Sequence, residues 1–178
     1  FAMADAVDDA RAYVAEATKT NPPWTGPTTG PVAQADKTIV YVAADLRNGG
    51  VLGVSEGVEE AAENIGWTVR VIDGQGSVSG RSAALQQAIA LQPDGIILGS
   101  VDANEQAEAI RLADAAGIKI VGWHATATTG PSESHPIFTN ITTDPLEISR
   151  AAASLVVADS DGKAGVVIFT DSVYEIAI

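Results

Sequence analysis

Short apolar runs rich in β-branched residues recur along the chain from residue 37 onward, and stretches with helical spacing separate them. We expect strands at residues 38–43, 68–72, 95–98, 119–122, 137–139 and 165–169. Helices are expected between them, at residues 54–65, 81–91, 103–116 and 146–158. Near-continuous apolar strands that alternate with helices are typical of a parallel sheet covered on both faces. The pattern therefore predicts an α/β fold, with a Rossmann-like parallel sheet built from right-handed βαβ units.

The first 36 residues have a different texture. Val7, Ala10, Val14 and Ala17 lie close to helical spacing, which predicts an amphipathic helix over residues 4–20. Residues 21–34 contain four prolines and two glycines, which oppose regular structure and predict an extended tether. We expect Trp24 to anchor this tether on the domain surface. Residues 1–36 are thus an N-terminal helix with a Pro/Gly-rich tether, and the α/β domain begins at residue 37.

Composition and charge narrow the classes of function. The chain is 46% hydrophobic and 19% charged, which is typical of a globular protein. Its 10 basic and 23 acidic side chains give a formal charge of −13, which opposes binding to phosphate backbones. We therefore expect neither nucleic acid nor an anionic membrane surface as a partner. The absence of cysteine excludes disulfides and thiolate metal sites.

The sequence also lacks the usual signals of membrane insertion and export. No apolar run approaches the ~20 residues of a spanning helix. The chain begins Phe1-Ala2-Met3 without a basic, apolar leader, so any secretory signal has been removed or never existed.

Polar side chains follow each expected strand. In an open parallel sheet, ligands bind beyond the carboxyl ends of the strands. The candidates in chain order are Asp45, Arg47, Asn48, Asp73, Gln75, Ser100, Asp102, Trp123, His124, Asn140 and Asp144. Amides, carboxylates and a guanidinium form paired hydrogen bonds, and an aromatic face covers C–H surface. This set predicts a small polar ligand with many hydroxyl groups.

Two glycine-rich segments lie where nucleotide-binding folds carry phosphate loops. No lysine follows Gly49-Gly50, as a P-loop requires, and Gly74-Gln75-Gly76 lacks the remaining spacing of the dinucleotide fingerprint. We interpret Gly49 and Gly50 as a tight turn that needs positive φ or close approach of the backbone. Close approach of this loop to a ligand is the alternative.

Three segments together resemble the type I periplasmic binding proteins, and more closely the ribose- and galactose-binding branch that serves ATP-driven sugar importers. They are TIVYVAADLRNGG with GVSEGVEEAAENIGWTVRVIDGQG, then QQAIALQPDGIILGSVDANEQAEAIRLADAAGIKIVGWHA, and finally TNITTDP. The resemblance covers residues 37–171. It implies a two-lobed periplasmic protein that closes over its solute by hinge bending and delivers it to the membrane permease of an ABC importer.

The resemblance also assigns expected roles to particular residues. It implies that Asn48 contributes an amide to the ligand, that Gln75 and Asp102 lie near the cleft floor, and that Asp144 marks the first crossing between lobes. Sugar-binding relatives often carry Asp-Arg after the fourth strand, whereas this chain has His124-Ala125. The cleft should therefore differ from a ribose site, with Trp123 supplying a stacking face.

The same resemblance divides the chain into domains. Residues 37–143 are expected to form the N-terminal α/β lobe without its returning final segment, and residues 144–178 the start of a truncated C-terminal lobe. We expect the chain to be a portion of a longer, monomeric protein.

Three functions of different classes are compatible with this fold. A solute-binding protein for a sugar or polyol, with no catalysis, cofactor or metal, is the preferred prediction. The sensor domain of a sugar-responsive repressor would need a basic helix-turn-helix before the first strand, where residues 1–36 are acidic and proline-rich. A Rossmann-like enzyme acting on a small metabolite is the other alternative, although no Ser/His/Asp set, H-x-x-x-H spacing or phosphate loop supports it.

Overall fold

The computed structural model describes residues 2–20 and 23–169, with side chains from residue 6 onward. Contacts between residues divide the chain into two units. The larger unit contains Val32–Thr143, and the smaller contains the two helices that precede and follow it.

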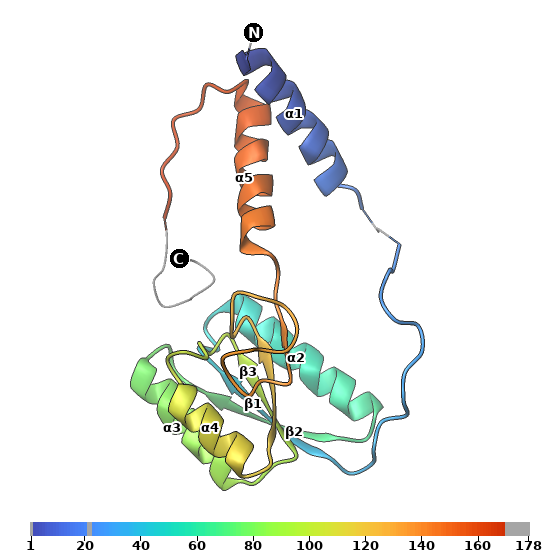
Figure 1. Ribbon diagram of the computed structural model, residues 1–178, viewed down its shortest axis with the longest axis vertical. Helices are drawn as coiled ribbons and strands as arrows, with labels where there is room; N and C mark the ends of the chain where they lie inside the picture. Colours follow the sequence, from blue (N-terminus) through green and yellow to red (C-terminus); the bar gives the residue numbers. More distant parts are fainter. Residues whose placement is uncertain (1, 21–22, 170–178) are drawn as a thin grey trace. The chain divides into compact units, whose positions relative to one another are not determined.

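A five-stranded parallel sheet forms the centre of the larger unit (Figure 1). Its strands, in the spatial order β2-β1-β3-β4-β5, are β1 (Thr38–Ala43), β2 (Thr68–Asp73), β3 (Gly95–Gly99), β4 (Lys119–Trp123) and β5 (Thr139–Ile141). Ala43 pairs with Asp73 on one side and with Gly99 on the other, and Gly99 pairs with Trp123. The strands therefore end together at one edge, and the expected α/β fold is confirmed.

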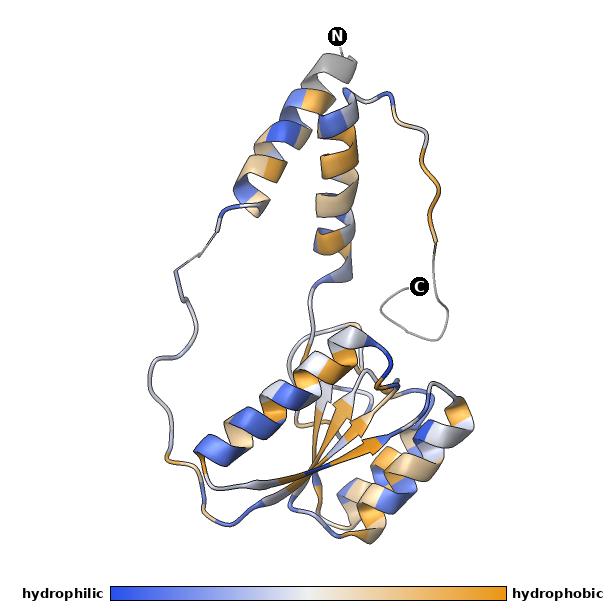
Figure 2. Cartoon of the chain, turned by 180° about the vertical axis from the view of Figure 1, so that it is seen from behind, coloured by the Kyte–Doolittle hydropathy of each residue, from blue (hydrophilic) through white to orange (hydrophobic). Residues whose placement is uncertain are grey.

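Helices cover both faces of this sheet. Helix α2 (Gly49–Asn64) contacts β1, β2 and β3, whereas α3 (Val78–Ala90) contacts β1 and β2, and α4 (Ala107–Ala115) contacts β4 and α3. Alternation along β1 sends Val40 and Val42 into the core beneath α3 and α4, and Tyr41 and Ala43 into the core beneath α2. Figure 2 shows the strands as largely hydrophobic, whereas hydrophilic and hydrophobic residues alternate along the helices that cover them.

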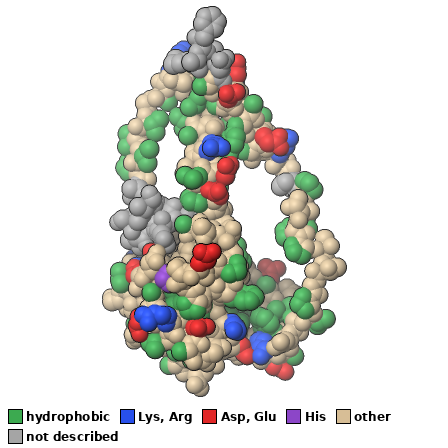
Figure 3. Space-filling model, viewed as in Figure 1, with side chains coloured by type: hydrophobic (Ala, Val, Ile, Leu, Met, Phe, Trp, Pro, Cys, Tyr) green, Lys and Arg blue, Asp and Glu red, His purple; other side chains and the backbone are tan. Residues whose placement is uncertain are grey.

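The smaller unit consists of α1 (Ala2–Ala17) and α5 (Pro145–Ser160), which pack against each other. Tyr13 Oη donates a hydrogen bond to Glu147 at 2.9 Å, and Arg11 pairs with Asp161 at 2.5 Å. Hydrophobic side chains remain on the surface of α5 (Figure 3), and Leu146 is 78% exposed. No helix in the described part of the chain is both long and apolar enough to cross a bilayer.

The expected strand at residues 165–169 is not present, because residues 163–169 have no regular structure. Ile168 and Phe169 are 86% and 92% exposed. A strand needs a neighbour that accepts and donates its backbone hydrogen bonds, and an apolar run does not supply one.

Two interpretations of the loops are also wrong. Helix α2 begins earlier than expected, at Gly49, and neither Gly49 nor Gly50 has a positive φ, so the pair starts a helix rather than a tight turn. Trp24 does not anchor the tether on a domain surface: it is 75% exposed, and its indole N–H donates to the carbonyl of Pro27. The tether is held instead by Trp67, whose indole N–H donates to the carbonyl of Gln34 at 2.6 Å.

The close approach of Tyr41 to Gly99 yields a stability prediction. A Cβ at Gly99 would lie 2.2 Å from Tyr41 Oη, and the ring is fully buried with its hydroxyl donating to Val51 O. We expect Gly99→Ala to lower the free energy of unfolding by about 1–3 kcal/mol, measured by urea denaturation.

The matched control for this variant is Gly53→Ala in α2, where nothing lies within 4 Å of an added Cβ. Helix propensity predicts a gain of about 0.5–1 kcal/mol there. Equal urea midpoints for the two variants would contradict the packing argument.

Candidate functional site

Six of the side chains expected to bind ligand follow the strands of the larger unit where these strands end. We call this set the strand-end edge, and its members are Asp45, Arg47, Gln75, Asp102, Trp123 and His124. Backbone hydrogen bonds join its loops: Ala44 N–H donates to Gly99 O at 2.8 Å and Ser100 N–H to Trp123 O at 2.8 Å. The shared register of the strands thus brings loops that are distant in sequence to one edge.

Asp45 and Arg47 form a bidentate ion pair in the loop after β1. Arg47 Nε lies 3.0 Å from Asp45 Oδ1, and Arg47 Nη2 lies 2.9 Å from Asp45 Oδ2. Hydrogen bonds from the Arg47 side chain, and then from its backbone N–H, hold the pKa of Asp45 below its usual value. The Arg47 side chain is 79% exposed. The pair therefore presents a fixed planar guanidinium to solvent at the edge.

The loop after β2 packs closely against this ion pair. Arg47 Nη2 lies 3.5 Å from the carbonyl of Gln75. A Cβ at Gly76, whose φ is +68°, would lie 2.5 Å from Asp45 Oδ2. Asp73 Oδ1 accepts hydrogen bonds from the backbone N–H groups of Leu46 and Gln75, which ties the two loops together. Asp73 therefore supports the site rather than facing a ligand.

Three of the expected ligand-binding side chains serve as local caps. Asn48 is the N-cap of α2, and its Oδ1 accepts from Gly50 N–H at 2.9 Å and from Val51 N–H at 3.3 Å. Asp102 Oδ1 accepts from Asn104 N–H at 2.7 Å. Asp144 is the N-cap of α5 and belongs to the smaller unit, whereas the strand-end edge belongs to the larger unit.

Trp123 and His124 form an aromatic pair at the end of β4. Alternation would place their side chains on opposite faces, but His124 has a φ of +53°, so the strand ends there and the chain turns. The two rings contact each other edge to face, with centroids 4.5 Å apart. Trp123 is partly buried against the cluster of Tyr41 and Val51, and its ring lies 3.8 Å from where a Cβ of Gly50 would be.

His124 is held by a second contact on its other side. Its Nδ1 lies 2.7 Å from Thr142 Oγ1, which fixes the plane of the ring. Burial lowers the pKa of His124, which favours the neutral imidazole. The residue can therefore offer a hydroxyl group a neutral donor or acceptor without adding a charge.

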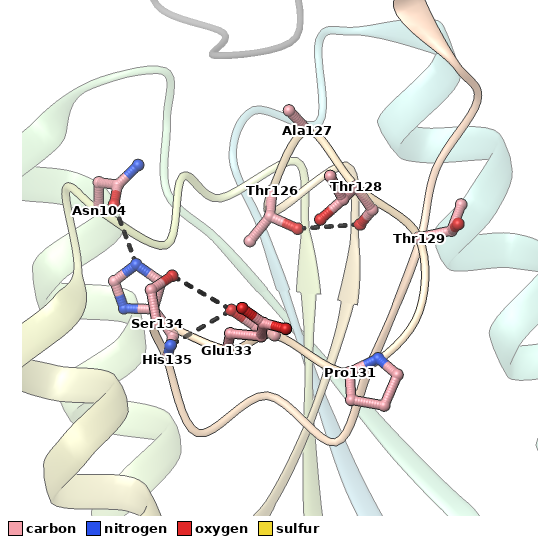
Figure 4. A pocket seen from close by; sticks show the side chains of 10 residues that line it. Asn104, Thr126, Ala127, Thr128, Thr129, Pro131, Glu133, Ser134 and His135 are labelled. Carbon is pink, nitrogen blue, oxygen red and sulfur yellow. Dashed lines mark hydrogen bonds between the residues drawn. The ribbon is translucent and has the colours of Figure 1, made fainter.

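The sequence analysis missed a pocket in the loop between β4 and β5, next to the strand-end edge (Figure 4). We call it the loop pocket; its volume is about 570 Å³, and its lining residues are Asn104, Thr126–Thr129 and Pro131–His135. His135 closes one side of this pocket, with its Nε2 2.9 Å from Asn104 Oδ1.

Asn140 holds the loop that forms this pocket. It is only 2% exposed, and its Nδ2 donates to the carbonyls of Thr126 and Thr128 while its Oδ1 accepts from Ala125 N–H. A Cβ at Gly122 would lie 2.5 Å from Asn140 Oδ1, so glycine makes room for the amide. Asn140 is therefore a supporting residue of the loop. This role has no clear signal in the sequence, because β5 is the short, mostly polar segment Thr139–Ile141.

Among the residues that the structure describes, no group of three or more His, Cys, Asp or Glu side chains has an arrangement suited to a metal ion.

The site lies on a domain whose family can be assigned. Residues 39–174 match the family described as the periplasmic binding protein domain. The chain belongs to this family. The resemblance seen in the sequence is therefore confirmed.

Two curated proteins of Escherichia coli (strain K12) are similar to the chain. The ABC transporter periplasmic-binding protein YphF is 25% identical over 152 residues, which cover 82% of this chain and 46% of YphF. The ribose import binding protein RbsB is 24% identical over 109 residues, which cover 61% of this chain and 37% of RbsB. The chain thus spans less than half the length of either relative.

Solved structures show the same fold. One is a solute-binding protein of an ABC transporter from Agrobacterium vitis, solved with bound allitol. Its TM-score is 0.68 at 22% identity, and the match covers 82% of this chain and 48% of the Agrobacterium chain. An ABC sugar transporter subunit from Rhodobacter sphaeroides 2.4.1 has a TM-score of 0.66 at 22% identity. The match covers 79% of this chain and 48% of the Rhodobacter chain.

The partial burial of the His124 imidazole predicts a dependence of stability on pH. An unfolded histidine binds its proton near pH 6.5, whereas folded His124 binds it only at a lower pH, so acid favours unfolding through this group. We expect the free energy of unfolding to fall more steeply with decreasing pH, below about pH 6.5, in the unchanged protein than in His124→Gln.

From about pH 7.5 upward, one unit above the ordinary histidine pKa, the residue is almost entirely neutral in both states and contributes almost no slope. Chemical denaturation at several pH values between about 5 and 8 measures both curves. Parallel curves over the whole range would show that His124 is not buried as described.

Proposed function

We propose that the chain is part of the solute-binding component of an ABC importer, which binds a sugar or polyol. The observation that carries this proposal is the gathering of six polar and aromatic side chains at the strand-end edge of a periplasmic binding protein domain. The names of similar proteins support the ligand class, since one is a ribose import binding protein and another was solved with allitol.

The donors and acceptors of the edge suit a hydroxylated solute. The Arg47 guanidinium offers several N–H donors, and Asp45 and Asp102 offer carboxylate oxygens, so vicinal hydroxyl groups can be held in pairs. Beside these polar groups, the aromatic pair of Trp123 and His124 offers a surface against which the C–H groups of the solute can pack. Gln75 and the amide of Asn48 complete the proposed contact set.

Binding would be linked to closure of two lobes. Val32–Thr143 would supply one lobe, and residues 144–178 would begin the other, with Asp144 at the first crossing. A solute that contacts both lobes binds the closed form better and shifts the population toward it. The closed form would then deliver the solute to a membrane permease, with the protein acting as a monomer in the periplasm and without catalysis.

The direct test is a thermal-shift screen of the protein in its natural length against pentoses, hexoses, polyols and amino acids. A solute at ~100 times its dissociation constant stabilises the folded state by about 2.7 kcal/mol, which raises the melting temperature by several degrees. We expect a hit among the sugars or polyols. Shifts from nucleotides or nicotinamide cofactors alone would contradict the proposal and favour an enzyme.

A substitution can separate the proposed contact of Asn48 with the solute from its role as a helix cap. Asn48→Asp keeps a side-chain acceptor for Gly50 N–H and Val51 N–H but removes the amide donor. We expect stability to change by less than about 0.5 kcal/mol while affinity for the solute falls by about tenfold or more, measured by calorimetric titration.

Asn48→Ala is the reference for this variant, because losing the cap should cost about 1 kcal/mol. Unchanged affinity in Asn48→Asp would restrict Asn48 to its capping role.

A further inference from the structure

We propose that the loop pocket is a second subsite of the solute site, which takes the second sugar unit of a disaccharide or similar glycoside. This inference rests on the proposed function, because it assigns the class of solute that the strand-end edge would bind.

The pocket begins where the strand-end edge ends. Asn104 follows Asp102 in the loop after β3, and Thr126 follows His124 in the loop after β4. Ala103 N–H donates to Ala125 O at 2.9 Å, which joins these two loops directly. Figure 4 shows Thr126 and Thr128 just beyond the ends of the strands, with His135 beside Asn104. A solute held at the edge can therefore extend into the pocket.

The pocket is formed in advance of any ligand. Its loop is fixed by the three hydrogen bonds of buried Asn140, and Gly130 exchanges backbone hydrogen bonds with Asn140 at 2.7 and 2.9 Å. Ser132 Oγ accepts from His135 N–H at 3.2 Å and so orients the histidine toward Asn104. A volume of about 570 Å³ lies within the range of pockets that hold small organic ligands. The preformed walls reduce the ordering cost of binding.

The lining selects a neutral, hydroxylated ligand. Among the described residues that line the pocket there is no lysine or arginine, and Glu133 is the acidic side chain. A phosphate or carboxylate would face this carboxylate on a chain whose formal charge is −13. The serine and threonine hydroxyls both donate and accept, as sugar hydroxyls do, and Pro131 offers apolar surface for C–H groups.

The test uses calorimetric titration of the protein in its natural length with matched probes: glucose with maltose, and galactose with melibiose. We expect at least one disaccharide to bind about tenfold or more tightly than its monosaccharide. Ser134→Trp places an indole in the pocket, at an exposed side chain, and should remove this advantage while affinity for the monosaccharide changes by less than about twofold.

The matched control is Thr68→Trp, which adds the same ring at an exposed position at the start of β2. This position lies at the end of the strands opposite to the strand-end edge, so the tighter binding of the disaccharide should be unchanged. If monosaccharides bind but neither disaccharide binds more tightly, the subsite is overturned and the proposed function stands. Equal losses for both members of a pair in Ser134→Trp would also overturn the subsite. If no sugar or polyol binds, the proposed function fails, and the subsite fails with it.

Discussion

The burial of β1 on both of its faces is the constraint on which the site depends. Val40 and Val42 fill one core, Tyr41 and Ala43 fill the other, and a shift of one residue in the register would exchange the two sets. Because β2 and β3 pair with β1 on its two sides, this register also fixes where their loops begin. The Asp45–Arg47 pair meets the Gln75 loop only because Ala43 and Asp73 end their strands opposite each other.

The same constraint explains what the sequence could predict. The strands β1 and β3, which are buried on both faces, leave continuous apolar runs. The less buried β2 and β4 were recognisable from their β-branched residues, and the polar residues after each run led to the strand-end edge. The first residues of the helices were harder to predict from the sequence. Asn48 caps α2 through its own side chain, and the two glycines after it suggested a turn. The segment at residues 165–169 has the composition of a strand, but pairing depends on a neighbour that composition does not reveal.

The sequence could predict which side chains form the site, but it could not predict how they are arranged in space. Spacing alone could not show that His124 adopts a positive φ, and this single backbone angle ends β4 and lets the imidazole contact the indole of Trp123. Nor could it show the loop pocket, whose shape depends on one buried amide reaching three backbone groups. Such features depend on tertiary contacts between residues that local patterns treat separately.

The pairing of α1 with α5 has a consequence for synthesis of the chain. The hydrogen bond between Tyr13 and Glu147 joins residues 134 positions apart, with the whole larger unit between them. At about 5–20 residues per second, α1 leaves the ribosome many seconds before its partner exists. Asp8, Asp9, Arg11 and Glu16 give this helix a charged surface during that interval. The smaller unit therefore forms only after the larger unit has been synthesised, although one of its two helices precedes that unit in the chain.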